Sequence, residues 1–331
     1  MSGDGPRALL GNGLRNRLRR LANVLDPGRR LRRLPQRLRA RRFRAAHRVL
    51  TAAEAGALIA RRIGDGTPSA VGKIGNSELR LLVRWWRAAR RGREPRFPGW
   101  LREEAMVGPG LFPADNATLA RAAALWVERL RAVDLLAVWH NRGEADILRA
   151  HGPAAVFTEF AALEPYRLAW PWTRALAGRR VAVVTPFPRT VLAQYARRHE
   201  IWGREIWGGA GVLPDFDLRV VEVPFGPALV PPAEPDWFAR LAMLEERLER
   251  EPFDVALIGA GALSIPLCAH AKALGRIGIH TGGATQVLFG IRGRRFEAEA
   301  HIAPLMNAHW VRPLPEETPE RCALVENAAY W

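Results

Sequence analysis

Short apolar runs alternate with helical patterns along this chain, and this alternation constrains the possible folds more than any other feature. In the second half, helical patterns at 190–198, 236–250 and 263–274 separate apolar runs at 180–185, 218–223, 254–259 and 276–280. Strands that alternate with helices form mostly parallel sheets with helices on both faces. The sequence therefore predicts an α/β fold with a Rossmann-like, mostly parallel sheet.

The first half carries weaker signals of the same kind. Thr51 and Glu54 have the spacing of a capping box, which predicts a helix from there to about residue 63. Further along we expect a strand at 70–74, a helix at 77–91, a loop at 92–116, a helix at 117–131, a strand at 134–139 and a short helix at 143–150. We expect two parts: an arginine-rich arm over residues 1–48 and an α/β domain over residues 49–331.

The formal net charge of +17 belongs mainly to the arm. Residues 1–46 hold 14 arginines and two acids and so contribute +12, which leaves +5 for the rest of the chain. Leucines recur at helical spacing among these arginines, which is typical of a basic amphipathic helix that binds anionic lipid. Binding to nucleic-acid phosphates, or a solvated and partly disordered tail, would also fit this composition.

Composition excludes several classes of protein. Two cysteines, Cys268 and Cys322, are too few for a disulfide scaffold or a cysteine zinc site. The first residues lack the uninterrupted apolar stretch of a signal peptide. The most apolar segment, 255–271, is short and contains Pro266, so a buried strand and helix explain it better than a membrane span. No serine-hydrolase elbow, P-loop, HExxH or CxxC pattern is present.

Ligands of parallel α/β sheets bind at the carboxyl ends of the strands, so the loops after the expected strands are the candidate sites. The first of these loops is Gly75, Asn76, Ser77 and Glu78. Asn and Ser favour helix N-caps, and an acid in the first turn suits the helix dipole, so the loop could be purely structural. Alternatively, Glu78, with Asn76 beside it, would bind a metal or a sugar hydroxyl.

A second loop contains Pro186 and Arg189 and leads into a helix that ends near Arg197. The free N–H groups of a helix N-terminus attract phosphate, and either arginine could add a bidentate contact. An ordinary proline turn is the alternative.

Glycines mark the remaining two loops. Gly259 and Gly261 resemble the start of a dinucleotide fingerprint, but Ser264 stands at the third glycine position and no acid follows the next strand, so we expect no NAD. Backbone N–H groups of such a turn could still bind a phosphate or sugar.

The last loop begins at His280 and contains Gly282, Gly283 and Gln286. Paired glycines allow a ligand to approach the backbone closely, although His280 could equally be a packed core residue. Further on, the C-terminal segment is rich in aromatic residues, so we expect it to pack on the domain, with Trp310 as a core residue or a sugar platform.

Two stretches resemble GT-D-type glycosyltransferase domains. The stretch GKIGNSEL at 72–79 is similar to their R-[FI]-G-[DNT]-x-E-L motif, whose D-x-E part helps to bind metal and nucleotide-sugar, and residues 254–284 resemble the second half of that domain.

Over about residues 68–331 the chain more closely resembles a group of bacterial and viral proteins linked with polysaccharide biosynthesis. The shared signatures are EPY at 164–166, PWTRALAG at 171–178, PF at 186–187, QYAR at 194–197, LPDF at 213–216, IGAGA at 258–262, GGATQVLFGIRGRR at 282–295, NAHWVRP at 307–313 and the final YW.

The resemblance implies a glycosyltransferase that moves a sugar from a nucleotide-sugar donor to a glycan or lipid-linked acceptor. Glu78 would orient the donor or bind Mg or Mn, although Asn76 replaces the motif's aspartate and is a weaker metal ligand. No zinc is expected. Glu164 and His280 are candidates for the base.

We expect a bacterial, cytoplasmic protein that the arm could hold at the inner membrane face, and nucleic acid is an unlikely partner. The alternatives are a nucleotide- or glycan-binding protein without turnover and an arm-driven nucleic-acid-binding protein.

Overall fold

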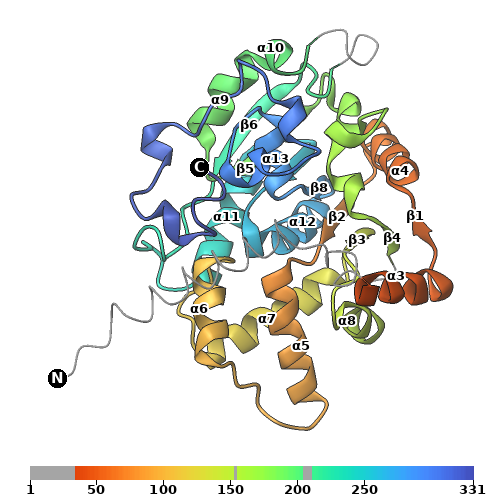
Figure 1. The fold of residues 1–331 in the computed structure, drawn as a ribbon, viewed down its shortest axis with the longest axis vertical. Coiled ribbons are helices and arrows are strands. Elements are labelled where there is room, and N and C mark those ends of the chain that lie inside the picture. Colours follow the sequence, from red (N-terminus) through yellow and green to blue (C-terminus); the bar gives the residue numbers. More distant parts are fainter. Residues whose placement is uncertain (1–33, 153–154, 204–210) are drawn as a thin grey trace.

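A computed structural model describes residues 34–152, 155–203 and 211–331 of the chain. Eight strands form one sheet in which every pairing is parallel, in the order β1-β4-β3-β2-β8-β7-β5-β6 (Figure 1). The strands are β1 Val49–Leu50, β2 Ser69–Lys73, β3 Leu135–Val138, β4 Val156–Glu159, β5 Arg180–Thr185, β6 Asp217–Glu222, β7 Val255–Ile258 and β8 Ile277–His280. The predicted α/β, Rossmann-like fold is confirmed.

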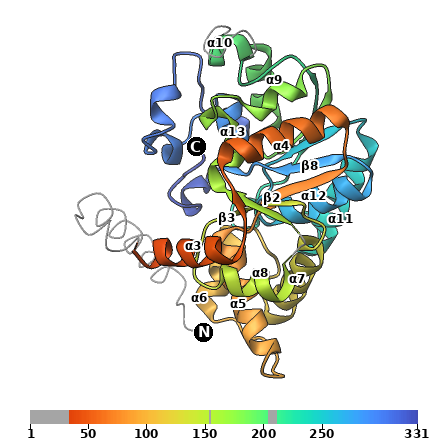
Figure 2. The same cartoon turned by 90° about the vertical axis from the view of Figure 1, so that its right-hand side faces the viewer.

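Helices cover both faces of the sheet (Figure 2). The first face packs against α5 Asn76–Ala89, α6 Gly99–Val107, α7 Asn116–Leu130, α8 Glu144–His151, α11 Trp237–Arg250 and α12 Ser264–Ala273. The second face packs against α4 Ala52–Asp65, α9 Pro188–Ala196, α10 Arg198–Trp202, α13 Gly283–Leu288 and α14 Arg294–Glu297. Because the central strands are buried on both faces, they read in the sequence as continuous apolar runs.

Local sequence signals set several element boundaries. Thr51 and Glu54 form both hydrogen bonds of the predicted capping box, and α4 ends at Gly66 in the left-handed conformation. Asp115 and Asp236 cap α7 and α11 through their side chains. The capping box explains why the start of α4 was predictable from the sequence, whereas α7 and α11 were predicted from their helical patterns alone.

The predicted loop over 92–116 is wrong in its middle, because residues Gly99–Val107 form α6. Pro98 is the N-cap of α6 and makes no side-chain capping bond, so no capping signal marks its start. The helix is instead held by tertiary packing, in which Leu101 and Ala105 are buried.

The end of the arginine-rich arm packs on the domain. Residues Leu34–Ala46 form α3, as the leucine spacing indicated, and Phe43 of α3 is buried. The side chains of Gln36 and Arg39 donate hydrogen bonds to the carbonyls of Trp139 and His140, after β3. Predictions for residues 1–33 lie outside the described residues.

The aromatic C-terminal segment also packs on the domain, as predicted. Trp310 and Trp331 are buried, which identifies Trp310 as a core residue, and the Trp331 indole donates a 2.8 Å hydrogen bond to the Glu317 carbonyl. Over the described ranges, no helix combines the length and the apolar character that a membrane span requires.

Candidate functional site

The sheet has a topological switch point at its centre, between the neighbouring strands β2 and β8. After β2 the chain passes to the first face through α5, whereas after β8 it passes to the second face through α13. Neighbouring strands whose connections leave toward opposite faces open a crevice at their carboxyl ends, where α/β proteins bind ligands. The predicted loops 75–78 and 280–286 flank this point.

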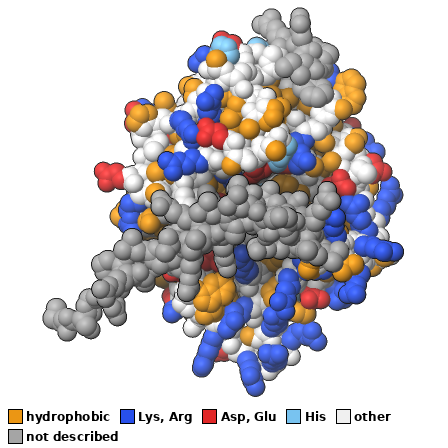
Figure 3. All heavy atoms as spheres, viewed as in Figure 1, with side chains coloured by type: hydrophobic (Ala, Val, Ile, Leu, Met, Phe, Trp, Pro, Cys, Tyr) orange, Lys and Arg blue, Asp and Glu red, His pale blue; other side chains and the backbone are white. Residues whose placement is uncertain are grey.

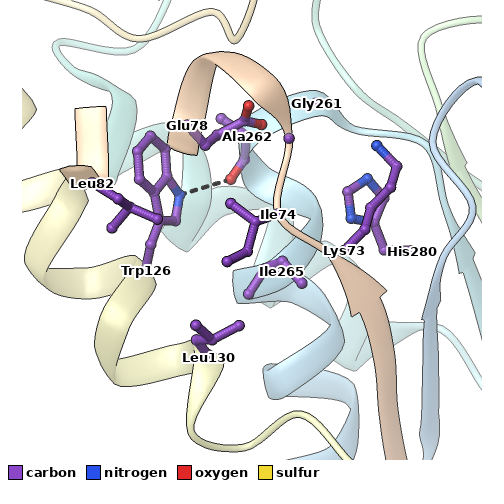
Figure 4. Close-up of a pocket in the computed structure, with 11 residues that line it drawn as sticks. Lys73, Ile74, Glu78, Leu82, Trp126, Leu130, Gly261, Ala262, Ile265 and His280 are labelled. Carbon is purple, nitrogen blue, oxygen red and sulfur yellow. Dashed lines mark hydrogen bonds between the residues drawn. The ribbon is translucent and has the colours of Figure 1, made fainter. Parts of the chain in front are cut away.

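A small cavity lies there between β2, α5, α7 and α12 (Figure 4). Of the predicted site residues, Gly75, Glu78, Gly261 and His280 line it. Its remaining lining is mostly apolar and includes Trp126, whose indole donates a 3.0 Å hydrogen bond to the Ala262 carbonyl. The structure therefore brings together residues from three of the four predicted loops.

Glu78 occupies the first turn of α5, and its carboxylate folds back over Gly75. A Cβ on Gly75 would lie 2.1 Å from the Glu78 Oε2 atom, so any larger residue at position 75 would push the carboxylate out of this position. Burial raises the pKa of Glu78, nearby Glu104 raises it further, and the charge of Lys73 opposes both. The carboxyl therefore takes up a proton at a higher pH than an exposed glutamate does.

The capping interpretation of Asn76 and Ser77 is wrong. The N-cap of α5 is Gly75, and neither side chain caps the helix. The Asn76 carbonyl oxygen instead accepts a hydrogen bond from Asn141, and the Ser77 hydroxyl donates a 2.8 Å bond to Glu104. Both side chains thus tie the start of α5 to neighbouring elements.

Lys73, the last residue of β2, is a site residue that the sequence prediction missed. Its ammonium lies 5.3 Å from the Trp139 ring centroid and 5.6 Å from that of Phe160, and it forms no ion pair with a described residue. Burial lowers the pKa of Lys73, whereas Glu78 and Glu164 raise it. The rarity of lysine in this chain, with Lys272 as the other, was the available signal.

His280, at the end of β8, lies beside Lys73 (Figure 4). Its ring is buried, and its Nδ1 atom has no hydrogen-bonding partner among the described residues. Burial lowers the pKa of His280 well below its usual range, and the charge of Lys73 acts in the same direction. The imidazole is therefore neutral at physiological pH.

Gly282 brings the paired-glycine loop against the same two side chains. Its φ of +57° and ψ of −129° are accessible to glycine and costly for other residues. A Cβ there would lie 3.4 Å from His280 Nε2 and 3.5 Å from Lys73 Cε. Gly282 thus approaches Lys73 and His280, but neither Gly282 nor Gly283 is among the residues that line the cavity with Glu78.

Other predicted residues support the site without facing the cavity. Gly259 packs against the Gly282 carbonyl, and Gly283 packs against the rings of Phe296 and Tyr330. The Gln286 amide is buried and donates to the carbonyls of Arg292 and Tyr330, so it fixes the C-terminal segment.

The predicted phosphate site at the start of α9 is filled by the protein itself. The backbone N–H groups of Arg189 and Thr190, just after Pro186, donate to the buried carboxylate of Glu317 at 2.6 and 3.1 Å. Arg197 lies at the other end of α9, where its guanidinium contacts Glu200 and His309. An internal carboxylate thus takes the place of the expected anion.

The C-terminal segment packs near the site on the second face without lining the cavity. Tyr330 Oη lies 3.5 Å from an Arg295 nitrogen, and burial raises the pKa of this tyrosine. Glu164, a predicted base candidate, is buried and accepts hydrogen bonds from Arg167 at 2.6 Å and Tyr166 at 3.2 Å. These bonds hold the Glu164 carboxylate in a structural ion pair.

The side chains that line the cavity do not provide enough ligands to hold a divalent cation by themselves. Mg and Mn prefer several oxygen ligands. Glu78 is the one acid among the described residues that line the cavity, and Glu104 is already bound by Arg80 and Ser77. Across the described part of the chain, no group of three His, Cys, Asp or Glu residues is arranged to hold a metal.

Comparisons of this chain with protein-family models, with curated proteins and with solved structures return no match.

Proposed function

We propose that the protein is a glycosyltransferase that moves a sugar from a nucleotide-sugar donor to a glycan or lipid-linked acceptor. The observation that carries this proposal is the convergence of Glu78 and Lys73 at the crevice between β2 and β8. A carboxylate can accept hydrogen bonds from sugar hydroxyls and a cation beside it can face a diphosphate, so the pair suits this substrate class. The resemblance of residues 72–79 and 254–284 to GT-D-type domains supports the same assignment.

Lys73 supplies the positive charge in this scheme. When the bond between the sugar C1 and the diphosphate oxygen breaks, negative charge develops on the leaving diphosphate. The Lys73 ammonium, without an ion pair among the described residues, is free to stabilise it, and the first backbone N–H groups of α5 add donors. Mg or Mn, if used, would bind together with the donor diphosphate.

Glu78 and the glycine turns hold the sugar end of the donor. The Glu78 carboxylate accepts hydrogen bonds from the sugar hydroxyls. Gly261 and Gly282 keep both sides of the crevice free of side chains. A new bond forms between the acceptor oxygen and C1, and the acceptor hydroxyl loses its proton. Glu78 and His280 both line the cavity, so either is placed to receive that proton.

A panel of nucleotide-sugars tests the proposal. Thermal-shift assays with and without Mn should identify a stabilising donor, and mass spectrometry should detect a glycosylated product after incubation with candidate acceptors. Glu78→Ala should abolish product formation. Glu128→Ala, an exposed acid on α7, is the matched control and should retain it.

Two outcomes would contradict the proposal. Equal stabilisation of Glu78→Ala and the unaltered protein by every donor would remove the site assignment. Tight donor binding without any product would favour the alternative, a nucleotide- or glycan-binding protein without turnover.

A further inference from the structure

A second basic surface lies at the end of α5, in the loop that leads to α6 and in the first turn of α6. We call it the tip surface and define it as the side chains of residues 84–102. This segment holds seven arginines and one acid, Glu94, so its net charge is +6. That exceeds the +5 of the whole chain outside residues 1–46, so the domain's positive charge is concentrated here.

The arginines of the tip surface face solvent and have no acidic partner in the described part of the chain. All seven are exposed, and none forms an ion pair with a described residue. Trp100 stands among them with 59 % of its surface exposed. Figure 3 shows the same concentration of blue side chains at the lower end of the molecule.

The tip surface is an ordered part of the fold. The Arg84 guanidinium donates to the Arg96 carbonyl, the Arg90 guanidinium stacks over Trp86, and the Phe97 N–H donates to Asn116. Buried Phe97 and Leu101 fasten the loop and α6 to the domain. The charges are therefore presented on a fixed scaffold, so little entropy is lost on binding.

We propose that the tip surface docks the protein on an anionic lipid bilayer. Figure 1 shows that α5 and the loop after it protrude at one end of the molecule, so the surface is convex and fits a flat partner. Arginines bind anionic headgroups, and tryptophan favours the interface between headgroups and acyl chains. Trp100 provides the apolar contact that a purely electrostatic patch lacks.

The shape of the surface argues against a single-stranded nucleic-acid partner. Proteins that bind single strands use concave basic grooves in which aromatic rings stack on successive bases. Here Trp85 and Trp86 are half-buried within the helix packing, which leaves Trp100 as the one strongly exposed ring of the described segment. The candidate site lies at the opposite end of α5, about 20 Å away along 14 helical residues, so docking would leave it open.

Vesicle co-sedimentation of the full chain tests this proposal. The probe is a series of vesicles with increasing phosphatidylglycerol in phosphatidylcholine, and the test variant is Arg87→Gln/Arg91→Gln/Arg93→Gln. Near a charged membrane each arginine is worth roughly a fivefold change in partitioning, so binding should weaken roughly 100-fold. Replacement of the same three residues by lysine keeps the charge and should preserve binding.

A matched control separates the tip surface from general basicity. Arg61→Gln/Arg250→Gln/Arg321→Gln removes the same charge from exposed arginines elsewhere and should bind within about threefold of the unaltered protein. Trp100→Ala should weaken binding even at high salt, where charges are screened.

Equal loss in both triple variants, or no loss in the tip variant, would overturn the proposal. A labelled single-stranded RNA serves as the competing probe. If the tip variant lost RNA binding but kept vesicle binding, the surface would be a nucleic-acid interface instead.

Discussion

Lys73 is unusual at the level of the single residue because its half-buried charge has no acidic ion-pair partner among the described residues. A burial-lowered pKa means that keeping Lys73 charged costs folding free energy at neutral pH. Residues that reduce stability in this way are typical of functional sites, where the charge is used by a ligand.

Lys73→Met should therefore separate stability from binding. Affinity for nucleoside diphosphates should fall roughly 10- to 100-fold, since hydrogen bonds to charged groups contribute about 1.5–3 kcal/mol. The free energy of unfolding should rise. Isothermal titration calorimetry and urea denaturation measure the two quantities.

The control for this prediction is the chain's other lysine. Lys272 donates to the Ala132 carbonyl at 2.9 Å and to Asp134 at 2.7 Å. Lys272→Met should lower stability and leave nucleotide affinity unchanged. The same response in both variants would refute the assigned role of Lys73.

Glu144 makes stability depend on pH. Its buried carboxylate accepts hydrogen bonds from the N–H groups of Trp139 and Asn141, but burial outweighs them and raises its pKa to about 7. The folded protein then keeps a proton that the unfolded chain has lost, so this residue's contribution to stability falls as the pH rises from about 4.5 to about 7.

Urea denaturation across that range should show the effect as a difference between variants. The free energy of unfolding of Glu144→Gln, relative to the unaltered protein, should rise with pH, by up to about 1.4 kcal/mol per unit. Glu320→Gln, at an exposed position, should show no such trend. A flat difference for Glu144→Gln would rule out the protonated carboxyl.

At the scale of elements, α9 depends on a carboxylate that is distant in sequence. Glu317 accepts hydrogen bonds from Arg189 and Thr190 at the start of this nine-residue helix. Glu317→Gln should lower the free energy of unfolding by about 1–3 kcal/mol. The glutamine NH2 group would replace one carboxylate oxygen, so a hydrogen-bond donor would face a backbone N–H donor. Glu316→Gln, next to it and exposed, should stay within about 0.5 kcal/mol of the unaltered protein.

The same helix shows what the sequence could predict and what it could not. The apolar run at 180–185 and the turn after it predict a strand followed by a helix, and both are present as β5 and α9. The filling of that helix N-terminus by Glu317 depends on a contact between residues more than 120 positions apart, which no local pattern records. Lys73 was missed for a related reason, because only the packing of Trp139 and Phe160 around it reveals its burial.

For the whole molecule, strand order explains how distant loops converge. Loops 75–78 and 280–283 are about 200 residues apart, yet β2 and β8 are neighbours in the sheet. The alternating pattern predicts that such loops share one edge, but the strand order that makes these two adjacent comes from the tertiary structure. The C-terminal segment then packs over the same point from the second face, through Arg295 and Tyr330.

The last residue tests whether this segment is structurally part of the site. The Trp331 indole donates a hydrogen bond to the Glu317 carbonyl. The main-chain oxygen of Trp331 accepts a 2.6 Å hydrogen bond from Arg312. Trp331→Ala should lower the free energy of unfolding by about 3–5 kcal/mol, as expected for a buried aromatic side chain. Exposed Trp100→Ala should change it by less than about 0.5 kcal/mol.

Hydrogen exchange followed by mass spectrometry locates the effect of Trp331→Ala. Amides of α13 and α14 should exchange faster, because Gln286 and Arg295 are fixed by backbone groups at the C-terminus, whereas α7 on the opposite face should keep its protection. Loosening of α13 would also free Gly282 from Lys73 and His280, so nucleotide affinity should fall together with protection there. Unchanged exchange in α13 would mean that the C-terminal segment covers the site without supporting it.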